Sequence, residues 1–274
     1  MVNFKNLVTR ALSGAVFVAV MVTCIWLSGY YFFALALFLG VAGLLEFYRL
    51  ADGIESVRVP RILGVIGGVL MLTTVFFAYC QKPSQPQLLA LNVLYVPLLF
   101  ICELYRKENT PLRNLSLTVM GWIYMVLPLA LLIYVESLPL GNRLVLAFFT
   151  LIWASDTGAY LVGAFLGRHK MFERISPKKT WEGFVGGLFF ALMTGYVFWQ
   201  LGLIDVWSLE KWMYVSSTLF IFGVLGDLVE SLFKRSLNVK DSGNFLPGHG
   251  GVLDRFDSAL IAAPFLFCFS LLLL

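Results

Sequence analysis

Residues 144–166 read LVLAFFTLIWASDTGAYLVGAFL, an apolar run in which Asp156 is the only charged side chain. A helix needs about 20 predominantly apolar residues to cross the hydrocarbon core of a bilayer, so this run predicts a membrane-spanning helix. A carboxylate at that depth costs at least about 2.5–3.5 kcal/mol and normally faces a wet cavity or a partner. Asp156 is therefore a candidate functional residue. The alternative is a polar group that only helps helices to pack.

The rest of the chain repeats this pattern. Of its 274 residues, 59% are apolar and 13% are charged, whereas soluble domains have roughly 45–50% and about 25%. The nine apolar runs cover residues 11–28, 31–47, 62–79, 87–102, 114–135, 144–166, 183–203, 212–233 and 254–274. We expect an all-α integral membrane protein with about nine transmembrane helices. Five of them fall in residues 1–140, and four, with their polar loops, fall in residues 141–274.

Basic residues are distributed unevenly between the two sides of these spans. Of the 20 Lys and Arg residues, only Lys82, Arg143 and Lys211 fall in loops on one side. Cytoplasmic loops of membrane proteins carry the excess of Lys and Arg, so the N-terminus is predicted to be cytoplasmic. The net charge of +4 is small and dispersed, which argues against nucleic acid as a partner.

Acidic residues gather at two helix ends beyond residue 150. The sequence GDLVESLFKR, residues 226–235, places Asp227, Glu230 and Ser231 on one helical face. The following DRFD sequence places Asp254 and Asp257 on one face of the next helix. Mg²⁺ prefers carboxylates, water and substrate phosphate, so the three aspartates are candidate metal ligands. In the alternative, the first Asp of DRFD only caps its helix and the second pairs with a basic residue.

Two polar loops on the same predicted side contain clustered bases. The loop KRSLNVKDSGNFLPGHGG, residues 234–251, combines cations with glycines that allow backbone amides to approach phosphate oxygens. The loop RHKMFERISPKKTWEG, residues 168–183, adds Lys178 and Lys179, although topology alone is an equal explanation for these bases. A lone loop histidine such as His249 is more often a simple hydrogen-bonding residue than a catalyst. Acids for metal and bases for phosphate suggest phosphoryl or nucleotidyl transfer onto a lipid, in a polar cavity at the cytoplasmic face.

The stretch SLFKRSLNVKDSGNFLPGHGGVLDRFDS, residues 231–258, resembles the signature of the phosphatidate cytidylyltransferase (CDP-diacylglycerol synthase) family. The fixed Lys-Arg, Lys-Asp, Pro-x-His-Gly-Gly and Asp-Arg-apolar-Asp positions of that signature are all present. The upstream segments SDTGAY (155–160), SPKKTWEG (176–183) and GDLVES (226–231) also resemble the family. The first 140 residues match it only in size and hydropathy.

The resemblance implies the reaction CTP + phosphatidate → CDP-diacylglycerol + pyrophosphate, dependent on Mg²⁺, and leaves a second cation open. The catalytic positions that it implies are Lys234, Arg235, Lys240, Asp241, His249 and Arg255. The implied substrate-binding positions are Ser176, Lys178, Lys179, Ser231, Gly250 and Gly251, and the implied metal ligands are Asp227, Asp254, Asp257 and Asp156. The expected partners are CTP, phosphatidate and the lipid bilayer of a bacterial inner membrane. The oligomeric state is left open, a homodimer included.

Two other functional classes compete with this one. An ion-coupled transporter should bury acids in several spans near the midplane, whereas here most acids sit at one face. The CDP-alcohol phosphotransferases need an acidic motif containing DGxxAR, which this sequence lacks. An enzyme that accepts another phosphorylated lipid, such as a phosphorylated prenol or dolichol, is the alternative that the sequence excludes least well.

Overall fold

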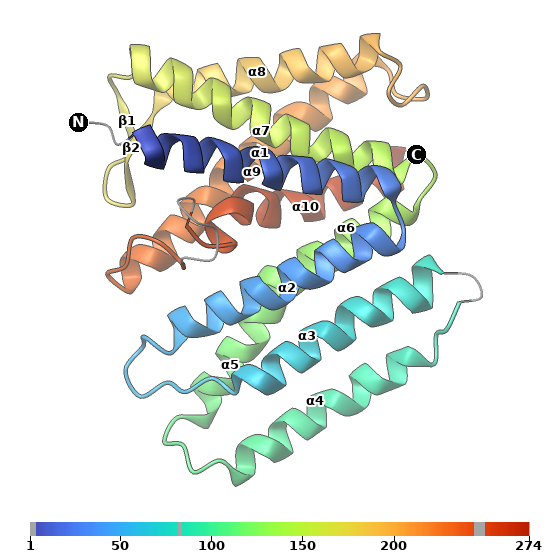
Figure 1. Cartoon of the computed structure of the whole chain (residues 1–274), viewed down its shortest axis with the longest axis vertical. Coiled ribbons are helices and arrows are strands. Elements are labelled where there is room, and N and C mark those ends of the chain that lie inside the picture. Colours follow the sequence, from blue (N-terminus) through green and yellow to red (C-terminus); the bar gives the residue numbers. More distant parts are fainter. Residues whose placement is uncertain (1–3, 82–83, 244–249, 274) are drawn as a thin grey trace. The chain divides into compact units, whose positions relative to one another are not determined.

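The protein is described by a computed structural model that covers residues 4–81, 84–243 and 250–273, with side chains from residue 13 onward. Helices dominate these residues (Figure 1). The elements are α1 (Phe4–Leu27), α2 (Tyr30–Ala51), α3 (Arg61–Val75), α4 (Leu88–Tyr105), α5 (Pro111–Gly121), α6 (Leu127–Ser137), α7 (Gly141–Leu166), β1 (Lys170–Phe172), β2 (Ser176–Thr180), α8 (Trp181–Gln200), α9 (Leu209–Ser236) and α10 (Leu253–Leu273). Two π-helical turns, Phe76–Cys80 and Trp122–Val126, extend α3 and join α5 to α6.

Eight helices in the described part of the chain are long and apolar enough to cross a bilayer. They are α2, α3 with its π-helical extension, α4, the continuous helix from α5 to α6, α7, α8, α9 and α10. They correspond to the last eight predicted spans, which confirms an all-α integral membrane protein. The first predicted span falls on α1, whose described apolar part is Ser13–Leu27. The ninth crossing therefore stays a prediction.

The short hairpin β1–β2 was not expected from the sequence. Its two strands pair antiparallel, with Lys170 opposite Thr180 and Phe172 opposite Ser176. It occupies the predicted loop between the spans 144–166 and 183–203. The hairpin therefore gives a fixed backbone to a basic sequence whose pattern predicts only a connecting loop.

The described residues form two compact units. The first contains α1 to α6 and the segment Asp241–Arg255, and the second contains α7, α8, α9, the hairpin and α10 from Phe256 onward. The sequence-based division into residues 1–140 and 141–274 does not anticipate that Asp241–Arg255 clusters with the N-terminal helices.

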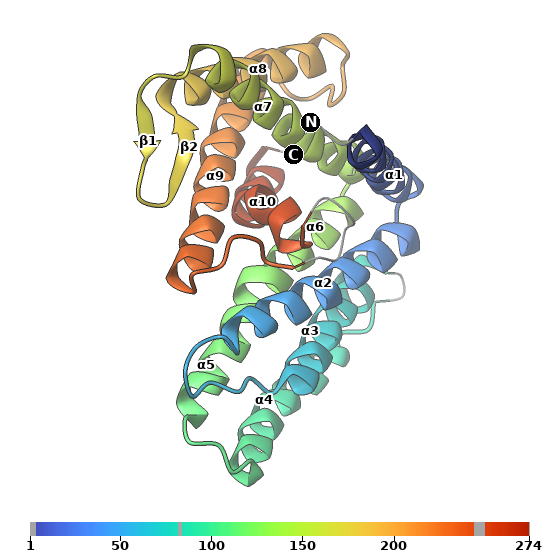
Figure 2. The same ribbon diagram turned by 60° about the vertical axis from the view of Figure 1, so that its left-hand side comes forward.

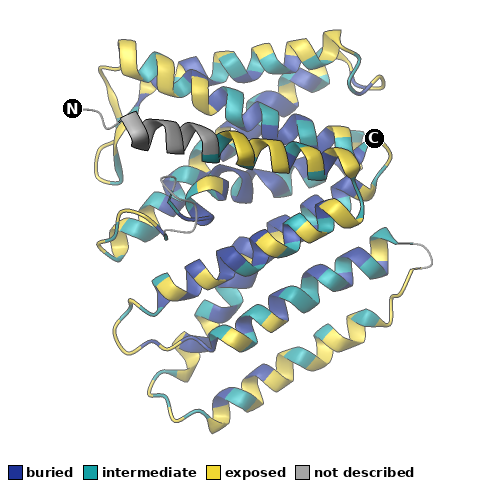
Figure 3. Ribbon diagram, viewed as in Figure 1, coloured by how far each residue is buried: buried dark blue, intermediate teal, exposed yellow. Residues whose placement is uncertain are grey.

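The core of the first unit is built around Tyr48 on α2, which is fully buried. Its hydroxyl donates to the carbonyl of Thr118 at 3.0 Å. A Cβ atom at Gly64 or Gly121 would lie 2.5 or 2.6 Å from the Tyr48 ring. Only glycine at these two positions lets α3 and α5 approach the ring so closely. By contrast, much of α4 is exposed (Figure 3), as expected for an apolar helix that contacts lipid.

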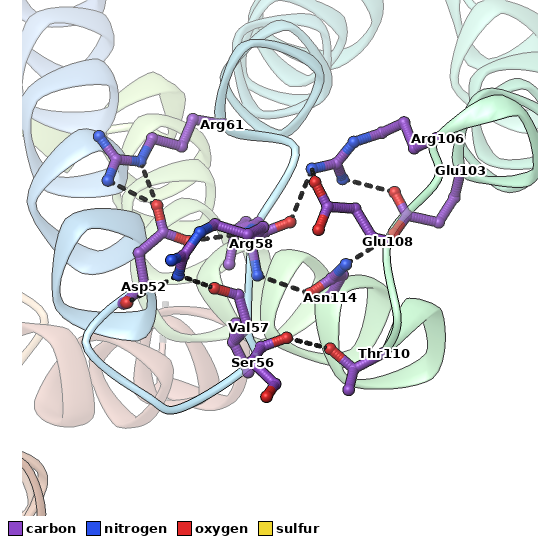
Figure 4. A network of polar contacts seen from close by, with 11 residues as sticks. Asp52, Ser56, Val57, Arg58, Arg61, Glu103, Arg106, Glu108, Thr110 and Asn114 are labelled. Atoms are coloured by element: carbon purple, nitrogen blue, oxygen red, sulfur yellow. Dashed lines mark hydrogen bonds and ion pairs between the residues drawn. The ribbon is translucent and has the colours of Figure 1, made fainter.

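A polar network ties together the connections at one end of the first unit (Figure 4). The buried Asn114 accepts from the backbone N–H of Arg58 at 2.9 Å and donates to Glu103 at 2.8 Å. Arg106 forms an ion pair with the same glutamate at 2.5 Å. Buried carboxylates are tolerated when such partners surround them. The arginines in these connecting segments therefore have structural partners, in addition to their expected influence on the orientation of the chain in the membrane.

The second unit depends on close helix crossings. A Cβ atom at Gly183 of α8 would lie 2.9 Å from the carbonyl oxygen of Ala159 on α7. A Cβ atom at Gly226 of α9 would lie 2.5 Å from the carbonyl oxygen of Asp257 on α10. The second crossing brings the backbone beside Asp227 directly against Asp257, Ser258 and Ile261 of α10. Figure 2 shows the hairpin beside α9 in the same unit.

Candidate active site

The second unit contains a cavity of about 500 Å³. Its wall is formed by α7, the hairpin, the start of α8 and the second half of α9. The polar side chains that line it are Asp156, Tyr160, Ser176, Lys178, Lys179, Thr180 and Asp227. Five of the predicted site residues therefore share one cavity, although they come from segments up to 71 positions apart in the chain.

The base of the hairpin is fixed to the first turn of α8. Thr180 caps this helix, because its hydroxyl accepts from the backbone N–H of Gly183 at 3.1 Å. Glu182 accepts from the backbone N–H groups of Arg168 and His169 at 3.1 and 3.2 Å. It also contacts the His169 ring at 2.5 Å. These bonds hold both ends of the hairpin, which in turn positions the lysines of β2.

Lys179 reaches across the cavity from β2 to α9. Its ammonium group lies 2.7 Å from Asp227 Oδ2 and donates to the carbonyl of Val224 at 3.3 Å. The second carboxylate oxygen of Asp227 accepts from the Ser231 hydroxyl at 3.3 Å. The Lys179 side chain is 23% exposed and that of Asp227 is 37% exposed. The pair is thus accessible from the cavity, where both groups can exchange their partners for a ligand.

Lys178, the neighbouring residue on β2, is exposed and also lines the cavity. Ser176 begins the same strand and lines the cavity as well. The cavity therefore presents two lysines and a hydroxyl from one strand. This combination suits an anion with several oxygen atoms, such as a phosphate chain.

Carboxylates gather close to the lysines in the same unit. Asp156 and Asp227 line the cavity. The carboxylate of Asp257 lies within electrostatic range of Asp227, Glu230 and Asp156. Its Oδ1 accepts from the backbone N–H of Ser258 at 2.7 Å. Negatively charged carboxylates repel one another. A cation placed among these carboxylates would therefore be stabilised.

A metal centre made of protein ligands alone is not formed by the described residues. Among them, no group of three or more His, Cys, Asp or Glu side chains is close enough to hold an ion. Mg²⁺, however, usually takes only one or two carboxylates and completes its shell with water and substrate phosphate. Asp156 and Asp227, which both line the cavity, fit that smaller requirement.

The segment Asp241–Arg255, in the first unit, is organised by Asp254. Its Oδ2 accepts from the backbone N–H and the hydroxyl of Ser242, at 3.0 and 2.9 Å. It also accepts from the backbone N–H of Gly251 at 2.9 Å. Gly250 has a φ of 83°, a conformation that favours glycine. These bonds of the Asp254 carboxylate fold the loop that precedes α10 and do not cap the helix. The capping alternative and the role of Asp254 as a metal ligand both stay predictions.

The remaining predicted residues are distributed between the two units. On α9, Lys234 forms an ion pair with Glu230 at 2.5 Å, and Arg235 donates to the carbonyl of Ile175 in the hairpin at 3.3 Å. Neither lines the cavity. Lys240, Asp241 and Arg255 are exposed. His249 lies outside the described residues.

Several residues at the site were not among the sequence-based candidates. Tyr160, Met171 and Phe184 line the cavity, but nothing in their local sequence distinguishes them from other apolar or interfacial side chains. Glu46 of α2 contacts the Asp241–Arg255 segment through Ser242 and Leu253. A signal for it was present, because Glu46 is the only charged residue inside the predicted span 31–47.

A membrane-embedded helical fold with a cavity of lysines and carboxylates defines a class of enzymes that handle phosphorylated substrates at a bilayer. Comparison with known proteins agrees with this class. Residues 8–273 match the model of the cytidylyltransferase family. The chain therefore belongs to the cytidylyltransferase family.

Curated relatives carry a more specific name. A phosphatidate cytidylyltransferase from Staphylococcus aureus (strain COL) is 36% identical over 216 residues, which cover 78% of this chain and 80% of the relative. One from Haemophilus influenzae is 34% identical over 276 residues, covering 93% of this chain and 96% of the relative. One from Rickettsia bellii is 35% identical over 213 residues, which cover 75% of this chain and 88% of the relative.

Proposed function

We propose that the protein transfers the cytidylyl group of CTP to phosphatidate, giving CDP-diacylglycerol and pyrophosphate. Family membership and the names of relatives aligned over most of the chain support this reaction. The structural observation that carries it is the cavity lined by Lys178, Lys179, Asp156 and Asp227, in which Lys179 pairs with Asp227. The cavity thus supplies both lysines that can bind phosphate and carboxylates that can bind a metal ion.

In the proposed reaction, a phosphate oxygen of phosphatidate attacks the α-phosphorus of CTP. The bond from that phosphorus to the oxygen bridging to the β-phosphorus breaks, and pyrophosphate leaves with this oxygen. A phosphate monoester dianion is already a nucleophile, so the reaction needs no strong general base. The work of the protein is to bring two anions together and to stabilise charge on the leaving group.

The side chains of the cavity have separate proposed roles. Lys178 and Lys179 would bind the phosphate groups of the substrates, with Ser176 as a hydroxyl donor. Lys234, Arg235 and Lys240 would add cationic groups, Ser231, Gly250 and Gly251 would contact substrate, and Asp241 would orient the basic loop. Roles for Arg255 and for His249, which lies outside the described residues, follow from the resemblance alone.

We also propose Mg²⁺ as the cofactor, with a second cation left open. Asp156, Asp227, Asp254 and Asp257 are the proposed ligands. The ion would neutralise charge on the triphosphate and on the departing pyrophosphate. The cluster of carboxylates around Asp257 supports this proposal, because it concentrates hard oxygen donors within one unit.

The proposed setting is the bacterial inner membrane, with nine spans and a cytoplasmic N-terminus. This orientation follows from the excess of Lys and Arg in one set of loops. It puts the hairpin and the cavity on the cytoplasmic side. CTP would then arrive from the cytosol, and phosphatidate from the inner leaflet.

The experiment that tests this function compares lipid acceptors. The purified protein in detergent is incubated with Mg²⁺, CTP labelled in its cytosine and either phosphatidate, polyprenyl phosphate or diacylglycerol. We expect labelled lipid from phosphatidate alone. Labelled product from polyprenyl phosphate but not from phosphatidate would establish the alternative acceptor and contradict the proposal.

A further inference from the structure

A buried glutamate lies on α2, outside the cavity of the second unit. Glu46 is 4% exposed and sits one turn before the end of a candidate membrane span. An acid inside such a helix is costly, so the groups that it contacts indicate its role. The proposed reaction assigns no role to this side chain.

The Glu46 carboxylate caps a helix that begins 207 residues later in the chain. Its Oε2 accepts from the backbone N–H of Leu253, the first residue of α10, at 3.0 Å. The first N–H groups of a helix have no partner within that helix, and the helix dipole favours negative charge there. Glu46 therefore satisfies a donor that would otherwise be buried and unpaired, because Leu253 is only 1% exposed.

The loop backbone is packed closely around the same carboxylate. A Cβ atom at Gly243 would lie 2.7 Å from Glu46 Oε1, and one at Gly251 would lie 2.5 Å from Oε2. Oε1 has no hydrogen-bond partner within the described residues. Two glycines are thus needed to let the chain pass the carboxylate on either side.

The hydroxyl of Ser242 connects Glu46 to Asp254. It lies 3.4 Å from Glu46 Oε2 and 2.9 Å from Asp254 Oδ2. Asp254 in turn accepts from the backbone N–H groups of Ser242 and Gly251. The position of Asp254, a proposed metal ligand, is therefore set by a network whose buried end is Glu46.

We propose that Glu46 is a positioning residue for cytidylyl transfer. It holds the start of α10 and the glycines on either side of residues 244–249 in the arrangement that presents Asp254. This inference rests on the proposed function for its catalytic consequence, but the anchoring can be measured without any activity. It also gives the N-terminal spans a task, because α2 supplies the anchor.

Hydrogen–deuterium exchange on the detergent-solubilised full chain tests the anchoring. Glu46→Gln keeps the size of the side chain and removes the charge. We expect the amides of Leu253 and Gly251 to exchange about ten- to hundred-fold faster, the scale of a lost hydrogen bond to a charged group. The hairpin amides should not change.

Glu136→Gln is the matched control. Glu136 is a buried acid of the same unit that also accepts from a backbone N–H, that of Gly29 at 2.8 Å. Its hydrogen bonds within the described residues go to Ser28 and Gly29 and not to the segment Asp241–Arg255. It should leave the exchange of Leu253 and the turnover number unaltered. Ser242→Ala, which deletes one hydroxyl of the network, is the second test variant if Glu46→Gln does not fold.

Kinetics then separate positioning from a purely structural role. We expect Glu46→Gln to lower kcat by at least about ten-fold, whereas Glu46→Asp, which keeps the charge, should restore part of it. Unchanged exchange at Leu253 and Gly251 would overturn the anchoring. Faster exchange with kcat within about two-fold of the parent would overturn the positioning role. A parent protein that makes no CDP-diacylglycerol would refute the proposed function, while the exchange data would still decide the anchoring.

Discussion

Replacing Lys179 by alanine removes the cation that reaches from β2 to α9. Two effects of different size are expected. As an ion pair of two partly exposed groups, Lys179 and Asp227 stabilise the fold by about 0.2–1 kcal/mol. As a ligand of substrate phosphate, the same ammonium would contribute about 1.5–3 kcal/mol to transition-state binding. The second value corresponds to a loss of about ten- to hundred-fold in kcat/KM.

The assay measures kcat/KM for CTP at saturating phosphatidate, together with the thermal unfolding midpoint. Lys170→Ala is the matched control, because Lys170 is an exposed lysine of the same hairpin that does not line the cavity. It should retain activity. Lys179→Arg keeps the charge and should lose less activity than Lys179→Ala.

A double-mutant cycle with Asp227→Asn tests the reasoning behind this prediction. If the pair were only structural, Lys179→Ala would leave the charge of Asp227 without its partner. Adding Asp227→Asn would remove that charge, and the double variant would recover activity. We expect no recovery, because each side chain would make its own contact with substrate or metal. A double variant more active than Lys179→Ala, or a loss below about three-fold in the single variant, would refute the assignment.

Three further predictions concern the helix crossing, the metal and the topology. Gly226→Ala should destabilise the protein by about 1–3 kcal/mol, because the new Cβ atom would lie 2.5 Å from the carbonyl oxygen of Asp257. Gly223→Ala, whose Cβ atom would lie 3.7 Å from the nearest atom, should be tolerated. Equal thermal unfolding midpoints for the two variants would contradict this prediction. Asp257→Asn should raise the Mg²⁺ concentration needed for half-maximal activity while the protein still inserts, and an unchanged requirement would remove Asp257 from the metal site. Single cysteines can replace the exposed Glu173 and Ser84 in a variant without native cysteines. They should react with a membrane-impermeant thiol reagent from opposite sides of the membrane. Labelling of both cysteines from outside would contradict the nine-span orientation.

The spanning helices could be predicted because composition alone determines where a chain can enter lipid. The eight candidate spans follow apolar runs that charged residues interrupt. Their ends were less predictable. The run 212–233 is part of α9, Leu209–Ser236, because Ser208 caps the helix at one end and the basic residues Lys234 and Arg235 continue it at the other. The β hairpin was missed because three- and five-residue strands leave too short a pattern.

The cavity residues could be predicted only as separate motifs. Asp156, Lys179 and Asp227 were each notable in the sequence, but their meeting depends on the packing of α7, the hairpin and α9. The link between Glu46 and Ser242 could not be predicted, because it joins residues 196 positions apart. No local periodicity encodes such a contact.

The most direct test of the proposed reaction follows the phosphorus atoms of CTP. The purified protein is given phosphatidate, Mg²⁺ and CTP labelled at either the α- or the γ-phosphorus, and the lipid and aqueous products are separated. Transfer of the cytidylyl group predicts α-label in the lipid and γ-label only in pyrophosphate, in equal amounts, with both reduced in Lys179→Ala. Label from the γ-phosphorus in the lipid, or lipid product without an equal amount of pyrophosphate, would contradict it.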